Sequence, residues 1–150
     1  MPDHESTPTP PRLRIIVLED NDNLRTVLRE LLAASGYEVF AYSRPSLCPI
    51  PAPETCRCRP GQACADVIVA DLGMPDMDGL RFVEFLREKN CRCRHMAVMS
   101  GMWKNEELRQ AERLRCKVLS KPFETGGFLR WLKAIEKQVD PRRSLCRIQA

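Results

Sequence analysis

The sequence predicts an α/β fold in which a doubly wound sheet of five parallel strands is covered by helices on both faces. The first observation is the apolar run at residues 67–70, whose continuous hydrophobicity is typical of a strand buried on both sides. The second is that short apolar runs alternate with segments of helical periodicity, which favours parallel strands joined by right-handed crossovers. A chain of 150 residues without internal repeats is expected to form one domain, here at residues 12–139.

The beginning of the chain predicts one strand-helix-strand unit. Residues 1–11 are Pro-rich and are expected to be disordered. Residues 13–18 are expected to form the first strand, and residues 24–32 carry apolar side chains at helical spacing before Gly36 ends that helix. Residues 37–42 have the aromatic and β-branched composition of a second strand.

Residues 43–65 interrupt this alternation. A doubly wound fold would place its second helix here, but the segment carries prolines at positions 45, 49, 51, 53 and 60. Proline rings remove backbone donors and are excluded from helix interiors. We therefore expect the second helix to be largely replaced by an irregular Cys/Pro-rich loop, which needs something to hold it in place.

The alternation resumes after the central strand, which ends in Asp71. Further strands are predicted at residues 96–100 and 117–120, and further helices at about 80–89, 105–115 and 126–138. On the second of these helices, Leu108, Ala111 and Leu114 are expected to line the inner face. Asp140 and Pro141 end the last helix, so residues 140–150 are expected to form a short basic tail.

Composition argues against several classes of partner. The formal charge is +4, with 24 basic residues against 20 acidic, and only 6% of residues are aromatic, so direct nucleic-acid binding is not expected. No apolar run approaches the roughly 20 residues that a membrane span needs, and the polar start of the chain does not resemble a signal peptide. We therefore expect a cytoplasmic protein without membrane contact.

The predicted fold gathers polar residues at one rim of the sheet, because parallel strands all end on the same side, where ligands of open α/β sheets bind. A lone Asp71 is explained equally well as a helix cap, so the residues at the other strand ends decide between a cap and a site. Three carboxylates placed together repel one another unless a cation neutralises them, and oxygen ligands select Mg²⁺. The predicted rim residues are Glu19, Asp20, Asp71, Ser100 and Lys121.

These residues have complementary chemical roles. Asp20 and Asp71 are expected to bind Mg²⁺ directly, Glu19 through water, and a backbone carbonyl such as that of Gly73 completes the set. A cation beside Asp71 lowers the charge barrier to its attack on phosphorus. Lys121 and the Ser100 hydroxyl are then placed to hold phosphoryl oxygens.

The same stretches closely resemble the receiver domain of two-component response regulators over residues 12–139. The matching motifs are LEDND with the acidic pair, VADLGMPDMDG with Asp71, VMSG with Ser100 and LSKPF with Lys121. The resemblance implies a flavodoxin-like fold with strand order 2-1-3-4-5, a cis bond before Pro122, and Asp71 as phosphoacceptor.

The resemblance also implies partners. The phosphoryl group would come from a histidine kinase or a phosphotransfer protein, and the signal would pass to a downstream protein that the sequence does not identify. Such a domain is not an enzyme beyond its own phosphorylation and dephosphorylation. With no output domain in the sequence, a stand-alone receiver is expected.

Two features depart from the family pattern. The family often carries an aromatic residue three positions before the lysine, whereas this chain has Val118 there, which puts an aromatic switch in doubt. The Cys/Pro-rich segment is the second departure. It leaves open a rival function, a degenerate receiver that works as a cysteine-based metal-binding or redox-sensing module.

The chain has eight cysteines, and topology places several at the rim opposite the acidic residues. Tetrahedral thiolate ligation of Zn²⁺ would tie down the Pro-rich loop. The predicted ligands are Cys56, Cys58 and Cys64, with Cys91 or Cys93 as the fourth. Two alternatives stay open: small buried side chains, or disulfides favoured by neighbouring arginines that lower thiol pKa values. Cys116 is expected in the core and Cys146 in the tail, outside any metal site.

Overall fold

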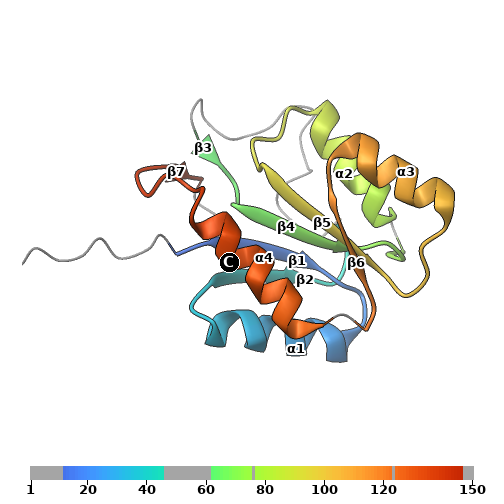
Figure 1. Ribbon diagram of the computed structural model, residues 1–150, viewed down its shortest axis with the longest axis horizontal. Helices are drawn as coiled ribbons and strands as arrows, with labels where there is room; N and C mark the ends of the chain where they lie inside the picture. The colour runs from blue at the N-terminus through green and yellow to red at the C-terminus, as the bar shows by residue number, and fades with distance from the viewer. Residues whose placement is uncertain (1–11, 46–61, 76, 123, 147–150) are drawn as a thin grey trace, which may run out of the picture.

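The computed structural model describes residues 12–45, 62–75, 77–122 and 124–146. Its main feature is a parallel five-stranded sheet with the order β2-β1-β4-β5-β6 (Figure 1). The predicted fold class and strand order are therefore confirmed. The strands are β1 (Arg14–Leu18), β2 (Glu38–Tyr42), β4 (Val67–Asp71), β5 (His95–Ser100) and β6 (Lys117–Ser120).

In the described part of the chain, two helices cover each face of the sheet (Figure 1). On one face, α1 (Asp22–Ala34) and α4 (Thr125–Glu136) pack against side chains that alternate along the strands, such as Ile15 and Val17. On the other face, α2 (Gly79–Glu88) and α3 (Asn105–Leu114) pack against the intervening side chains. All five residues of β4 are buried, as its continuous hydrophobicity predicted.

The crossover from β2 to β4 is described only in part. Residues 46–61 lie outside the described residues, so most of the predicted Cys/Pro-rich loop cannot be compared with the prediction. Among the residues described on either side of that gap, there is no α-helix between β2 and β4. This arrangement is consistent with a loop in place of the second helix.

A second, two-stranded sheet was not predicted. Strand β3 (Gln62–Ala63) pairs in parallel with β7 (Ser144–Leu145), and the backbone N–H of Cys146 donates to the carbonyl of Ala63 at 2.8 Å. The segment expected to be a tail therefore contains a paired strand. This strand binds the end of the described chain to the residues that lead into β4 (Figure 1).

The inner face predicted for α3 was partly wrong. Ala111 is buried and Leu114 is half-buried, but Leu108 has 39% of its surface exposed. The helix contacts β6, which is the edge strand of the sheet in the described part of the chain. Only a narrow stripe of α3 is therefore buried. None of the helices in the described part of the chain is long and apolar enough to cross a membrane.

Candidate functional site

The structure places the predicted rim residues at the carboxyl ends of four strands. Glu19 and Asp20 follow β1, Asp71 is the last residue of β4, Ser100 is the last residue of β5, and Lys121 follows β6. Because these strands are parallel, the residues meet at one rim, although up to 102 positions separate them in the chain.

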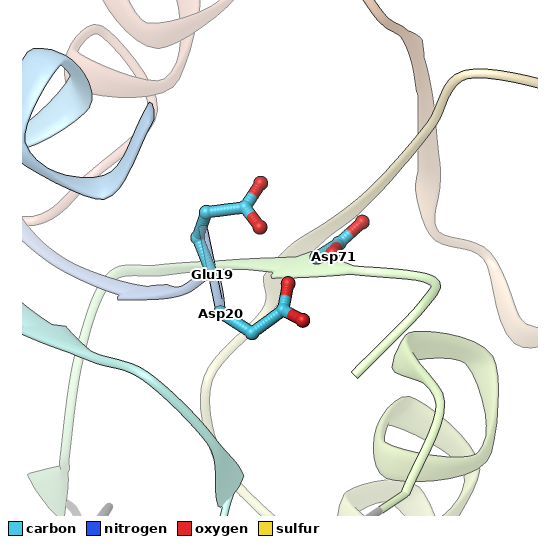
Figure 2. A group of neighbouring side chains, drawn as sticks. All are labelled: Glu19, Asp20 and Asp71. Carbon is cyan, nitrogen blue, oxygen red and sulfur yellow. The ribbon is translucent and has the colours of Figure 1, made fainter. Parts of the chain in front are cut away.

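Three carboxyl groups gather at this rim. One oxygen from each of Glu19, Asp20 and Asp71 lies within 4.8 Å of the others, and Figure 2 shows the three groups around a common space. Glu19 and Asp71 are buried, whereas Asp20 is exposed. A methyl group added at Gly73 would lie 4.0 Å from Asp71 Oδ2, so the backbone of Gly73 passes beside that carboxylate. This all-oxygen donor set fits a hard divalent cation such as Mg²⁺.

Lys121 joins two of these carboxyl groups. Its Nζ lies 2.6 Å from Glu19 Oε1 and 2.9 Å from Asp71 Oδ1. Burial raises the pKa of Glu19 to about 7, against the hydrogen bonds from Lys121 and from the Asn21 backbone, which lower it. Burial alone would lower the pKa of Lys121, but the hydrogen bonds to both carboxylates raise it. The ammonium therefore supplies positive charge at the point where the buried carboxylates meet.

Helix starts fix the loops that carry the acidic residues. Asn21 caps α1 by accepting a hydrogen bond from the Leu24 backbone at 2.9 Å, and its own N–H donates to Glu19 Oε2 at 3.2 Å. Asp78 caps α2 by accepting from the Arg81 backbone at 2.7 Å. These caps hold each loop at a defined angle to the strand before it.

Gly79, the first residue of α2, has a role that the sequence analysis missed. A methyl group added there would lie 2.7 Å from the carbonyl oxygen of Asp71 and 3.0 Å from Val98 Cγ1. Only a glycine allows the helix start to pack this closely against the end of β4. The Asp-Gly pair at residues 78 and 79 marks a helix start, but nothing in it predicts this contact.

Ser100 is buried, and its hydroxyl is engaged by the loop that follows β5. The Oγ atom donates to the carbonyl of Met102 at 2.9 Å and accepts from the Met102 N–H at 3.1 Å. The backbone carbonyl of Ser100 also accepts from the N–H of Lys121 at 2.8 Å. Ser100 thus links the loop after β5 to the residue that contacts Asp71.

Trp103, in the same loop, was also missed. Its indole Nε1 donates to the carbonyl of Leu119 at 3.0 Å, and its ring packs with Val118 against the core beneath α2 and α3. An aromatic residue shortly after a strand end is a weak sequence signal, since only the structure shows that it reaches β6. Trp103 therefore places an aromatic side chain beside β6, although the β6 residue Val118 is not aromatic.

The predicted zinc ligands are only partly described. Cys56 and Cys58 lie outside the described residues, whereas Cys64, Cys91 and Cys93 lie at the rim opposite Asp71. Within the described ranges, the three acidic residues form the only group of His, Cys, Asp or Glu side chains placed to share a metal ion. Zinc therefore stays a prediction without support from the described cysteines.

These cysteines differ in their surroundings. The neighbouring Cys64 side chain and the charge of Arg87 lower the pKa of Cys91 to about 7, against burial, which raises it. Burial raises the pKa of Cys93 well above its usual range and that of Cys116 to about 11. Cys91 and Cys93 line an open cavity of about 630 Å³ at this rim.

Comparison with known proteins agrees with this architecture. Among solved structures, the receiver domain of response regulator 1452 from Francisella is 18% identical, with a TM-score of 0.70, over 86% of this chain and 100% of that one. The chemotaxis protein CheY4 from Vibrio cholerae is 20% identical, with a TM-score of 0.65, over 83% and 98%. The non-phosphorylated HemR receiver domain from Leptospira biflexa is 22% identical, with a TM-score of 0.68, over 87% and 99%.

At these identities the structural likeness shows the fold alone. A search of curated proteins finds no significant sequence match. The family model of the response regulator receiver domain, in contrast, matches the sequence over residues 15–133. This span contains all the rim residues described above. The chain therefore belongs to the response regulator receiver domain family.

Proposed function

We propose that this chain is a phosphoacceptor of a two-component phosphorelay, which accepts a phosphoryl group on Asp71 in a Mg²⁺-dependent reaction. The observation that carries the proposal is the position of Lys121, whose Nζ contacts both Glu19 and Asp71 beside the exposed carboxylate of Asp20. A buried nucleophile, a metal-binding pair and a cation for phosphoryl oxygens are thus within one site.

The metal has a defined place in this proposal. Glu19, Asp20, Asp71 and the carbonyl of Gly73 would hold it, since these are the oxygen donors that the rim brings together. When bound, Mg²⁺ supplies positive charge that lowers the electrostatic barrier between an anionic nucleophile and an anionic phosphoryl group.

The chain's own residues carry the transfer step. One Asp71 carboxylate oxygen forms a bond to phosphorus while the bond from phosphorus to the donor breaks, and the electron pair leaves with the donor group. That donor is the imidazole of a histidine kinase or a phosphotransfer protein. Lys121 turns from the Asp71 carboxylate to the incoming phosphoryl oxygens, so its charge offsets the charge that arrives.

The signal then passes through the loop after β5. The Ser100 hydroxyl exchanges its Met102 partners for a phosphoryl oxygen, and the loop that contains Trp103 follows it. This movement alters the face made by α3, β6 and α4, where Met102 and Leu108 are 76% and 39% exposed. A downstream protein that binds this face reads the phosphorylation state. The protein acts as a signalling domain, with no turnover beyond its own phosphorylation and dephosphorylation.

Labelling with acetyl phosphate tests the phosphoacceptor. We expect one acid-labile phosphate per wild-type chain with Mg²⁺, little without it, and none for Asp71→Asn. The matched control is Asp78→Asn, because Asp78 lies in the same loop and asparagine caps a helix as well as aspartate does. Undiminished labelling of Asp71→Asn would place the phosphate elsewhere and refute the assignment.

A further inference from the structure

The cavity at the rim opposite Asp71 is not used by the phosphoacceptor function. Its volume is about 630 Å³, and it lies between β3, the end of α2, the segment that leads into β5 and the chain after α4. These segments meet at the amino end of the sheet (Figure 1). Sites for small organic ligands have volumes of roughly 300–1,000 Å³. The cavity is therefore large enough for a molecule of nucleotide size.

Arginine dominates the charge of this cavity. The charged side chains that line it are four arginines and two aspartates: Arg87, Arg92, Arg94, Arg143, Asp66 and Asp140. Two of the arginines belong to the Cys-Arg-Cys-Arg sequence at residues 91–94, in which Cys93 is buried while Arg92 and Arg94 are exposed. Like charges gathered in one cavity repel one another, so the arrangement favours an anion between them.

The two aspartates are already bound to arginines. Nε and Nη2 of Arg143 lie 2.5 Å and 2.6 Å from the two carboxylate oxygens of Asp66, which is buried. Asp140 forms an ion pair with Arg142, whose Nε lies 3.5 Å from Asp140 Oδ1. Arg142 does not line the cavity, so it leaves the other arginines there unopposed. The unbalanced positive charge of the cavity therefore comes from α2 and from the segment before β5.

Arg87 and Arg94 carry donors that an anion can use. Arg87 is half-buried, and its Nη1 donates to the carbonyl of Cys93 at 3.2 Å, which fixes the guanidinium at the cavity wall. Within the described ranges, this carbonyl is its one hydrogen-bond acceptor, and Arg94 has neither an acceptor nor an ion-pair partner. Both guanidinium groups thus have N–H groups available for a ligand.

The neighbouring His95 also experiences this positive charge. Burial lowers the pKa of His95, and the charges of Arg94 and Arg87 lower it further, against Asp66, which raises it. His95 also lines the cavity. At neutral pH its imidazole is therefore uncharged and adds a hydrogen-bonding group to the wall rather than another cation.

The wall of the cavity fits an organic phosphate better than a carboxylate. One guanidinium fork occupies both oxygens of a carboxylate, whereas a terminal phosphate presents three oxygens and can bind two guanidinium groups at once. Arg87 and Arg94 come from separate segments, as such binding requires. Val139 and Leu145 give another part of the wall an apolar surface. The ligand should therefore combine a phosphate group with an apolar body.

We propose that this cavity binds a small organic phosphate of nucleotide size. Its phosphate group accepts hydrogen bonds from Arg87 and Arg94, and its apolar part lies against Val139 and Leu145. Binding is non-covalent and joins the end of α2 to the chain after α4. The site lies at the opposite rim from Asp71, so its occupation does not require phosphorylation.

Calorimetric titration of the full chain with ADP tests this proposal. EDTA is present throughout, so no divalent cation carries the nucleotide to the acidic rim. We expect saturable binding of ADP and weaker binding of two other probes: inorganic pyrophosphate, which lacks the apolar part, and citrate, which offers only carboxylates. The proposal is overturned if ADP does not bind at about 1 mM, or if either probe binds as tightly as ADP.

Variants assign the binding to the cavity. Arg87→Gln and Arg94→Gln should each weaken ADP binding by about tenfold, because each removes a charge-assisted hydrogen bond. The matched control is Arg113→Gln, which removes the same charge from an exposed side chain of α3 outside the cavity and should bind ADP as the wild type does. Equal weakening in all three variants would show that overall charge attracts the nucleotide, and would refute the site.

Two further measurements keep the outcome clear. Circular dichroism checks that Arg87→Gln is folded; Arg94 is exposed, so Arg94→Gln decides the matter if Arg87→Gln unfolds. Asp71→Asn should bind ADP like the wild type, although it should not accept phosphate. Loss of ADP binding in Asp71→Asn would place the nucleotide at the acidic rim and contradict the proposal. The phosphoacceptor and the cavity can therefore fail independently.

Discussion

At the scale of single residues, Glu19 and Asp20 are neighbours in sequence but have different surroundings. Glu19 is fully buried and its Oε1 lies 2.6 Å from Lys121 Nζ, whereas Asp20 faces solvent. Burial raises the pKa of Glu19 to about 7 from an ordinary value of 4.5. A proton would therefore compete with the proposed metal ion for the same carboxyl group near neutral pH.

This competition predicts how Mg²⁺ binding depends on pH. Below about pH 7 Glu19 holds a proton that the metal must displace, so affinity should rise with pH by up to about tenfold per unit and level off above pH 7. Isothermal titration calorimetry from about pH 6 to about pH 8 measures it. Glu19→Gln should bind with a much flatter pH dependence. An equally steep dependence in that variant would assign the proton to another group.

The same pKa shift lowers the stability of the fold as pH rises, whereas it raises the affinity for Mg²⁺. Because the folded pKa lies above the unfolded one, the unfolded chain releases its proton first as pH rises from about 4.5 to about 7. Without a metal, the Glu19 contribution to stability is therefore lost across this interval.

The sequence predicted much of the site at this scale, for a physical reason. Strand ends can be read from apolar runs, so Asp71, Ser100 and Lys121 could be placed at one rim before any coordinates were known. The role of Gly79 could not be predicted, because it depends on the approach of α2 to the Asp71 carbonyl. The hydrogen bond from the Trp103 indole to the Leu119 carbonyl could not be predicted either, because it also depends on how separate segments pack together.

At the scale of elements, the start of α2 is packed against the end of β4. The N–H of Gly79 donates to the carbonyl of Leu72 at 3.1 Å, directly after the phosphoacceptor candidate. The helix start and the strand end thus form one rigid corner. Any movement of this corner would displace Asp71.

A methyl group at Gly79 should therefore strain the corner. Gly79→Ala must displace backbone rather than a flexible side chain, so we expect a loss of about 1–3 kcal/mol in unfolding free energy. Urea denaturation measures it. The control is Gly101→Ala, because a methyl group there would meet nothing within 4 Å. Equal losses in both variants would show that the close approach at Gly79 has no energetic consequence.

The elements that the sequence missed were those without periodicity. Strands β3 and β7 have two residues each, too few for any alternation to be visible. Periodicity also gave α3 an inner face, but it could not show that the helix lies at a sheet edge that leaves Leu108 exposed. Long buried strands were predicted well because their composition alone reports burial on both faces.

At the scale of the whole molecule, the end of the described chain is fastened to the amino end of β4. Arg143 binds Asp66 through two contacts, at 2.5 Å from Nε and 2.6 Å from Nη2. The Asp66 side chain is only 4% exposed and also accepts from the backbone of Arg14 at 2.8 Å. A buried carboxylate is thus satisfied partly by a residue more than seventy positions away.

Removal of this guanidinium should destabilise the fold. Arg143→Ala leaves the Asp66 charge buried without its ion-pair partner, so we expect a loss of about 2–4 kcal/mol in unfolding free energy. Thermal or urea denaturation measures it. Arg142→Ala is the matched control, because that side chain is 90% exposed and its ion pair with Asp140 should contribute little. If both variants unfold alike, the Arg143 contact does not anchor the chain end.

The Arg143 contact also determines where the described chain enters and leaves the domain. Its Nη2 donates to the carbonyl of Arg12 at 3.0 Å, and Arg14 Nη1 donates to the carbonyl of Cys146 at 2.5 Å. Both ends therefore lie at the amino rim, with the length of β4, roughly 17 Å, between them and the Asp71 rim (Figure 1). A biosensor surface or a fluorescent label attached next to either end of the described chain would be tethered at this rim. The immobilised protein would then present its Asp71 rim to the solution, where the proposed phosphodonor could approach without obstruction from the support.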